Sequence, residues 1–338
     1  MNHGKWNSIT DVPGVQVGHI TLDKQLPDGD YICTGVTAIL PHSGNIFEQK
    51  VPAASFVLNG FGKTAGLIQI EELGVIESPI MLTNTFSVGA VLEGTLTYML
   101  DENRSIGDST SSLNVVVGEC NDSYLNSMRL MKVKPHHAIE AIQNAKAGPF
   151  AQGAVGAGKG MICYGMKGGI GSSSRVIQRD GESCTVGVLT LTNFGKVEEC
   201  NIADWLGRNA DILPQSKVDD NKPDGSVIIV VATDAPVNER QLKRLAKRAA
   251  IGLGRTGTHI HNGSGDIIIA FSNAFTIPHT SEHMTMAYEL LRDDHPMMND
   301  LFQAVIEATE EAVYQSMIHA ETTKGRQGRV VEKWPISR

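Results

Sequence analysis

The stretch that most constrains this chain is a polar turn that runs directly into a continuous apolar segment. Residues 222–225 read Lys-Pro-Asp-Gly, and residues 227–232 read Val-Ile-Ile-Val-Val-Ala. The first group has the composition of a tight turn, whereas the β-branched run after it is typical of a strand buried on both faces of a sheet. The pattern therefore predicts a buried strand with Ser226 at its mouth.

The position of Ser226 directly after Gly225 would allow the serine to become a nucleophile with its own base. A serine hydroxyl is a weak nucleophile until a base removes its proton. Cleavage of the Gly225–Ser226 bond would leave a free α-amine beside that hydroxyl. An α-amine titrates near pH ~7.7, where it can act as the base. A Gly-Ser pair that only enters a strand is the structural alternative, and this stretch alone leaves both interpretations open.

Composition narrows the class of protein. The 338 residues carry a formal net charge of −8 and five cysteines without a paired metal-binding spacing. A chain of this length can bury a large core, and its acidic balance speaks against nucleic-acid binding. The sequence begins without an apolar signal region and has no run of membrane-spanning length. We expect a cytoplasmic protein with reduced thiols that binds no metal, nucleic acid or membrane.

Strand and helix patterns alternate along the chain. Apolar β-rich runs bounded by turn residues predict strands near 34–41, 79–83, 114–118, 185–192, 227–232 and 264–271. Helical spacing or helix boundary signals predict helices near 67–73, 90–100, 136–142, 241–253, 282–292 and 297–318. Residues 216–224 form a polar linker suited to cleavage, and residues from 325 onward are expected to be an extended tail.

Several predicted strands carry polar side chains at their ends, where sites of α/β proteins usually lie. Glu119 and Asn121 close one strand, and Asn193 ends another. The Asn193 amide could donate to an oxyanion, although a cap or turn asparagine would look the same. Ser264 and Asp266 stand at the mouth of a third strand. Because they are two residues apart, they share one face of that strand.

Two glycine-rich segments resemble functional sites of other kinds or at other positions, a phosphate-binding loop and a second cleavage site. Residues 153–160 fit the first seven positions of the phosphate-binding G-x-x-x-x-G-K-[ST] loop. The eighth residue is Gly160, which lacks the hydroxyl that holds Mg²⁺, so nucleotide binding is not expected. Gly171–Ser172 is a rival cleavage site. We expect no buried strand after it, because Arg175 and residues 178–180 interrupt the apolar run.

Together these segments resemble the family of L-aminopeptidase/D-Ala-esterase-amidase and β-peptidyl aminopeptidase. The shared motifs appear in one order along nearly the whole chain, which makes the resemblance specific. They are residues 9–19 (ITDVPGVQVGH), 34–38 (TGVTA), 82–85 (LTNT), 168–171 (GGIG), 225–226 (GS), 232–236 (ATDAP) and 264–271 (SGDIIIAF).

The resemblance implies an α/β fold, a four-layer αββα sandwich related to N-terminal-nucleophile hydrolases and ornithine acetyltransferase. Residues 1–338 would form one domain that cuts itself into an α chain, 1–225, and a β chain, 226–338, which stay together. Four such αβ units would form a homotetramer. The implied activity is release of N-terminal residues from short peptides, aminoacyl amides or esters, without a metal or cofactor.

The resemblance also implies a role for individual residues. Ser226 resembles the nucleophile and Asn193 the oxyanion donor. Ser264 and Asp266 resemble the pair that orients the new amine, and Glu119 resembles the acid that binds the substrate's amino group.

Three departures bear on the site. Asp266 stands where some relatives have glutamate, which is a shorter reach with the same charge. Lys63 stands where glutamate is expected, which leaves self-processing intact but bears on substrate preference, and Asn121, a substrate-binding candidate, stands where an aromatic residue is common, which implies a different side-chain pocket.

Two other functions fit parts of this pattern. An N-acyltransferase of the ornithine-acetyltransferase type would pass the acyl group to an amine rather than to water. That family uses a threonine nucleophile, so Ser226 argues against it. An uncleaved, non-catalytic binding protein of the same fold is the other alternative, and the presence of Ser226, Ser264 and Asn193 argues against that one.

Overall fold

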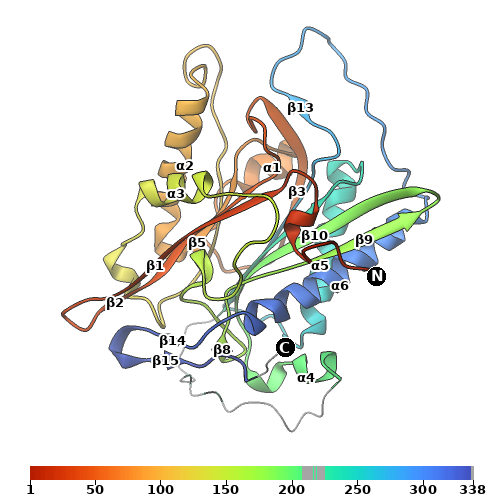
Figure 1. Ribbon diagram of the computed structural model, residues 1–338. Coiled ribbons are helices and arrows are strands. Elements are labelled where there is room, and N and C mark those ends of the chain that lie inside the picture. Colours follow the sequence, from red (N-terminus) through yellow and green to blue (C-terminus); the bar gives the residue numbers. More distant parts are fainter. Residues whose placement is uncertain (208–215, 217, 219–224, 336–338) are drawn as a thin grey trace.

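Two β-sheets packed between two pairs of helices form the body of the protein (Figure 1). The computed structural model describes residues 1–207, 216, 218 and 225–335. One sheet has the strand order β1-β2-β5-β6, made of β1 (Gln16–Gln25), β2 (Tyr31–Leu40), β5 (Ile80–Asn84) and β6 (Val116–Cys120). The other has the order β13-β3-β12-β11-β10-β9, with β4 paired to β3.

The strands of the second sheet are β3 (Gln49–Gly60), β4 (Val75–Ile76), β9 (Ile170–Arg179), β10 (Glu182–Asn193), β11 (Ser226–Thr233), β12 (Gly265–Ser272) and β13 (Ile277–Pro278). The helices are α1 (Leu67–Leu73), α2 (Val88–Glu102), α3 (Pro135–Gln143), α4 (Ile202–Trp205), α5 (Glu239–Arg255) and α6 (Met297–Ile318). Two small hairpins pair β7 (Ile162–Cys163) with β8 (Met166–Lys167) and β14 (Thr323–Lys324) with β15 (Val330–Val331).

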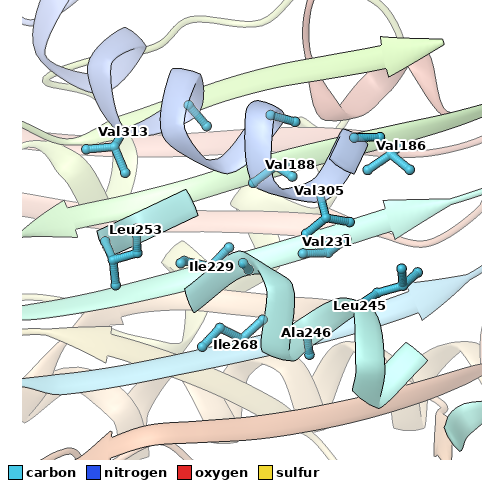
Figure 2. Packing of buried hydrophobic residues seen from close by; sticks show 14 of the residues in the cluster. Val186, Val188, Ile229, Val231, Leu245, Ala246, Leu253, Ile268, Val305 and Val313 are labelled. Atoms are coloured by element: carbon cyan, nitrogen blue, oxygen red, sulfur yellow. The ribbon is translucent and has the colours of Figure 1, made fainter. Parts of the chain in front are cut away.

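Three apolar layers hold the four structural layers together. Helices α2 and α3 pack on the first sheet through a cluster that includes Val91 and Ala138. A central cluster fills the space between the two sheets. Helices α5 and α6 cover the outer face of the second sheet through a third cluster, part of which Figure 2 shows. The predicted αββα sandwich is therefore confirmed.

The strand predicted to be buried on both faces lies inside the larger sheet. All eight residues of β11 are buried. Ile228 and Val230 join the central cluster, whereas Ile229 and Val231 face α5 and α6 (Figure 2). Strand β11 pairs antiparallel with β10 and parallel with β12. The predicted linker before it lies outside the described residues, apart from Ser216 and Val218.

The helix expected at residues 282–292 is absent. This segment belongs to an irregular arm between β13 and α6, drawn in light blue in Figure 1. Leu291 packs partly buried against the third cluster, whereas four other apolar residues of the segment are exposed: Met284, Met286, Tyr288 and Leu290. They recur at every second position, a spacing that places no apolar stripe on one side of a helix.

Two further expectations were wrong. No buried strand was expected after Gly171–Ser172, but both residues lie inside the mostly buried strand β9, paired with Thr190 and Leu189 of β10. The charge of Arg175 does not interrupt this strand, because its guanidinium forms ion pairs with two glutamates of α6. The segment after residue 325 is also no free tail: β14 and β15 form a hairpin, and Trp334 is buried.

Two simpler expectations concern cysteines and membrane segments. All five cysteines are buried and free, as expected for reduced thiols. Among the described residues, we find no helix with the length and apolar character needed to span a membrane.

Candidate active site

The ends of three neighbouring strands meet at Ser226. It opens β11, faces Asn193 at the end of β10, and faces Gly265 at the start of β12. The Gly265 N–H donates to the carbonyl oxygen of Gly225 at 3.3 Å. The sheet register therefore brings together Ser226, Asn193 and the Ser264–Asp266 segment, which are far apart in the sequence.

The hydroxyl of Ser226 lies against the peptide bond that precedes it. Its Oγ donates to the Gly225 carbonyl oxygen at 2.7 Å, and the residue is only 5% exposed. Gly225 has no room for a side chain, since a Cβ there would stand 2.6 Å from the Asn193 oxygen and 2.7 Å from the Phe194 Cα. This close backbone approach explains why glycine precedes the serine.

Ser264 and Asp266 form a buried pair beside this junction. The Ser264 hydroxyl donates to Asp266 Oδ1 at 2.8 Å. The second carboxylate oxygen of Asp266 is buried and has no hydrogen-bond partner among the described residues. Burial raises the pKa of Asp266 to about 6, against the opposing effects of Ser264 and the nearby His261. Asp266 Oδ2 can therefore accept a hydrogen bond from a further donor.

This raised pKa predicts how stability depends on pH in an uncut Ser226→Ala chain. The unfolded carboxyl ionises near pH ~3.9, but the folded one ionises near 6, so the folded chain loses stability as pH rises through this window. Adding Asp266→Asn removes that loss. We expect urea titrations to show that the double variant has a higher free energy of unfolding than Ser226→Ala alone, by a difference that grows between about pH 4 and 7. A difference that stays constant over this range would contradict the assignment.

The side-chain amide of Asn193 is held at both ends. Its Oδ1 accepts from the Ile162 N–H at 3.0 Å, and its Nδ2 donates to the Asn121 carbonyl oxygen at 2.8 Å. The amide is therefore oriented by backbone groups from two other segments and caps no helix. The backbone carbonyl of Asn121 thus contacts the Asn193 amide, and the side-chain oxygen of Asn121 accepts from the Ser123 N–H.

Glu119 lies in β6 of the other sheet and is buried. Its Oε1 accepts from the Lys63 N–H at 2.8 Å, and its Oε2 accepts from the Thr85 hydroxyl. A Cβ on Gly62 would stand 3.5 Å from Glu119 Oε1 and 3.9 Å from the Gly265 Cα. Gly62 thus lies between Glu119 and the mouth of β12, which joins the acid to the Ser226 region.

Some groups of this site carry no signal in the sequence. The Ile162 and Lys63 N–H groups act through the backbone, which every residue other than proline offers. Thr85 belongs to a motif of the resemblance, but the motif does not show which partner its hydroxyl finds. The Lys63 side chain is exposed, with its Nζ 4.6 Å from the centre of the Phe61 ring.

Comparisons with known proteins identify the family of this chain. A family model described as peptidase family S58 matches residues 7–331. The β-peptidyl aminopeptidase of Sphingosinicella microcystinivorans is 39% identical over 98% of this chain and 86% of its own length.

Two solved structures are also similar. The PH0078 protein of Pyrococcus horikoshii OT3 has a TM-score of 0.89 and 47% identity, over 99% of this chain and 92% of its own. The L-aminopeptidase D-Ala-esterase/amidase of Ochrobactrum anthropi, described as a prototype of the serine aminopeptidases and a variant of the Ntn hydrolase fold, has a TM-score of 0.87 and 34% identity, over 98% and 92%. The chain therefore belongs to peptidase family S58 and has the Ntn-hydrolase fold of the serine aminopeptidases.

Proposed function

We propose that this aminopeptidase cleaves its own Gly225–Ser226 bond and then uses Ser226 to release N-terminal residues from short peptides, aminoacyl amides or esters. The observation that carries the proposal is the Ser226 hydroxyl, 2.7 Å from the carbonyl oxygen of the bond to be cut and aligned with Asn193 across the sheet.

Self-cleavage follows from this placement. Ser226 Oγ attacks the Gly225 carbonyl carbon and loses its proton, and the carbon–nitrogen bond then breaks as the nitrogen takes up a proton. The resulting ester is hydrolysed by water, which leaves a carboxylate on Gly225 and a free α-amine on Ser226. The products, 1–225 and 226–338, would stay together because β10 and β11 lie on opposite sides of the cut and pair over eight positions.

In turnover, the new α-amine takes the proton of the Ser226 hydroxyl while Asn193 donates to the oxyanion. Ser264 and Asp266 orient the amine, and the unpartnered Asp266 oxygen offers it an acceptor. An adjacent carboxylate also raises the pKa of an amine, which holds back the neutral base. Asp266 therefore acts mainly on orientation.

Glu119 would bind the free amino group of the substrate, since it is a buried carboxylate beside the site with two donors already on it. We expect Glu119→Gln to self-cleave but to lose about ten- to a hundredfold in turnover, the equivalent of one charge-assisted hydrogen bond of about 1.5–3 kcal/mol. Rates on matched free and N-acetylated aminoacyl p-nitroanilides measure this loss. If the variant kept wild-type kinetics on the free amines, the amine would have to bind elsewhere.

The acyltransferase alternative gains no support, because the matching relatives are aminopeptidases and the candidate nucleophile is a serine. The non-catalytic alternative fits poorly with the intact arrangement of Ser226, Ser264 and Asn193. Homotetrameric assembly and a cytoplasmic location remain predictions from the resemblance and the composition.

Trapping the acyl-enzyme tests the proposal. The protein is mixed with a slowly hydrolysed aminoacyl ester, quenched in acid and digested. We expect the acyl group on the peptide that begins with Ser226, and no adduct in Ser226→Ala. An adduct on another residue would overturn the assignment of the nucleophile. Rates on a panel of L-, D- and β-aminoacyl p-nitroanilides then define which residue is released.

A further inference from the structure

Lys167 is a fully buried lysine behind the candidate active site. It lies in β8, and its Nζ donates to the carbonyl oxygens of Gly158 at 3.0 Å, Met161 at 2.7 Å and Gly168 at 2.7 Å. No carboxylate among the described residues lies within ion-pairing distance of it. Lysine is almost never fully buried without a charged partner, so this position calls for an explanation.

One of these carbonyls connects Lys167 to Asn193. The Met161 C=O and the Ile162 N–H belong to the same peptide group, and that N–H donates to Asn193 Oδ1 at 3.0 Å. The Met161 oxygen also accepts from the Gly168 N–H at 3.2 Å. The hydrogen bonds therefore run in one direction, from the ammonium through the peptide group to the Asn193 amide, whose Nδ2 points onward to the Asn121 carbonyl.

Hydrogen bonds in such a chain polarise one another, and a charged donor at its start strengthens the bonds that follow. We propose that Lys167 is a positioning residue of the peptidase reaction: its ammonium polarises the 161–162 peptide group, and through it makes the Asn193 amide a stronger donor to the oxyanion. This inference rests on the proposed roles of Ser226 and Asn193.

The charge of the Lys167 ammonium does more than hold this loop in its fold, because backbone hydrogen bonds already do so. Strand β7 pairs with β8, and the Lys167 N–H donates to the Glu332 carbonyl at 2.8 Å. An ammonium has three N–H donors, which matches the three carbonyls around Nζ. Burial lowers the pKa of Lys167 to about 7, while the nearby Cys33, Cys163 and Asp122 oppose this shift and Lys159 adds to it.

Two substitutions separate charge from hydrogen bonding. Lys167→Met removes both, whereas Lys167→Gln keeps an amide that can donate to the carbonyls. The matched control is Lys159→Met, which removes a charge from the same loop. The Nζ of Lys159 forms an ion pair with Asp23 at 2.8 Å instead of binding carbonyls beside Asn193. We expect both Lys167 variants to lose about tenfold or more in kcat with KM within about twofold, and to self-cleave more slowly by a similar factor. The control should stay near the wild type.

Inhibitor binding gives a second measurement. A peptide aldehyde that forms a tetrahedral adduct should lose affinity in the Lys167 variants in proportion to kcat/KM, whereas a simple amino amide that resembles the ground state should not. Equal losses for both inhibitors, a rise in KM alone, or an equal effect of Lys159→Met would overturn the inference.

The remaining outcomes are also decisive. If Lys167→Met does not fold, Lys167→Gln decides alone, and an unfolded Lys167→Gln chain would reduce Lys167 to a structural role. Fully active Lys167 variants together with an inactive Ser226→Ala would reject this inference only. An active Ser226→Ala would reject the proposed function itself.

Discussion

Ser226→Ala is expected to remain a single uncut chain and to lose aminoacyl p-nitroanilide turnover by about 10⁴- to 10⁶-fold, the scale seen when a catalytic serine is removed. Both effects follow from one missing atom. Without Oγ, nothing attacks the Gly225 carbonyl, so neither the α-amine nor the acyl-enzyme can form. The fold should survive because, within the described parts of the chain, the Ser226 hydroxyl forms a hydrogen bond only with the oxygen of the adjacent Gly225.

Ser172→Ala is the matched control, since Ser172 also follows a glycine and is buried in a strand of the same sheet. Its hydroxyl donates to the Val188 carbonyl and accepts from the Ile9 N–H. Its loss should therefore reduce stability by about 1–3 kcal/mol but leave self-cleavage complete. Electrophoresis and rate measurements distinguish the two variants. A Ser226→Ala protein that still divides into two fragments would place the nucleophile elsewhere.

Asn193→Ala should lower kcat by about 10²- to 10³-fold, with a smaller change in KM. Removing the amide leaves the developing oxyanion without this donor, whereas substrate binding in the ground state does not depend on it. Single-turnover kinetics of the cleaved enzyme, together with the rate of self-cleavage followed by intact mass, measure the two reactions that share this donor.

Asn121→Ala provides the comparison for Asn193→Ala. This substitution removes a side chain whose oxygen accepts from the Ser123 N–H, and it keeps the backbone carbonyl that accepts from Asn193. Self-cleavage should therefore proceed normally. If Asn193→Ala changed KM more than kcat, its amide would be binding substrate rather than stabilising the transition state.

Much of the framework could be predicted from local patterns. The run after Ser226 predicts a doubly buried strand because six consecutive apolar residues leave no polar face. The helix predicted near 67–73 forms as α1, and Gly74 ends it in a left-handed conformation with a φ of 67°, which glycine adopts without strain. The grouping of Ser226, Asn193, Ser264 and Asp266 came from the family motifs, since only tertiary register brings β10, β11 and β12 together.

The rest depends on contacts that local sequence does not specify. Arg175 lies within a strand because two glutamates more than 130 residues away balance its charge. Lys167 follows a short turn in a glycine-rich segment, where a lysine is normally read as solvent-exposed. Its burial is visible only once the carbonyls of Gly158, Met161 and Gly168 surround it.

The central claim is that the working enzyme carries Ser226 as a new N-terminus. Intact-mass analysis of purified wild-type protein, on the same sample whose turnover is measured, tests it most directly. We predict two components with the masses of residues 1–225 and 226–338, the smaller with serine as its first residue, and activity that rises with the fraction cleaved. A fully active sample that contains only the uncut chain would contradict the mechanism.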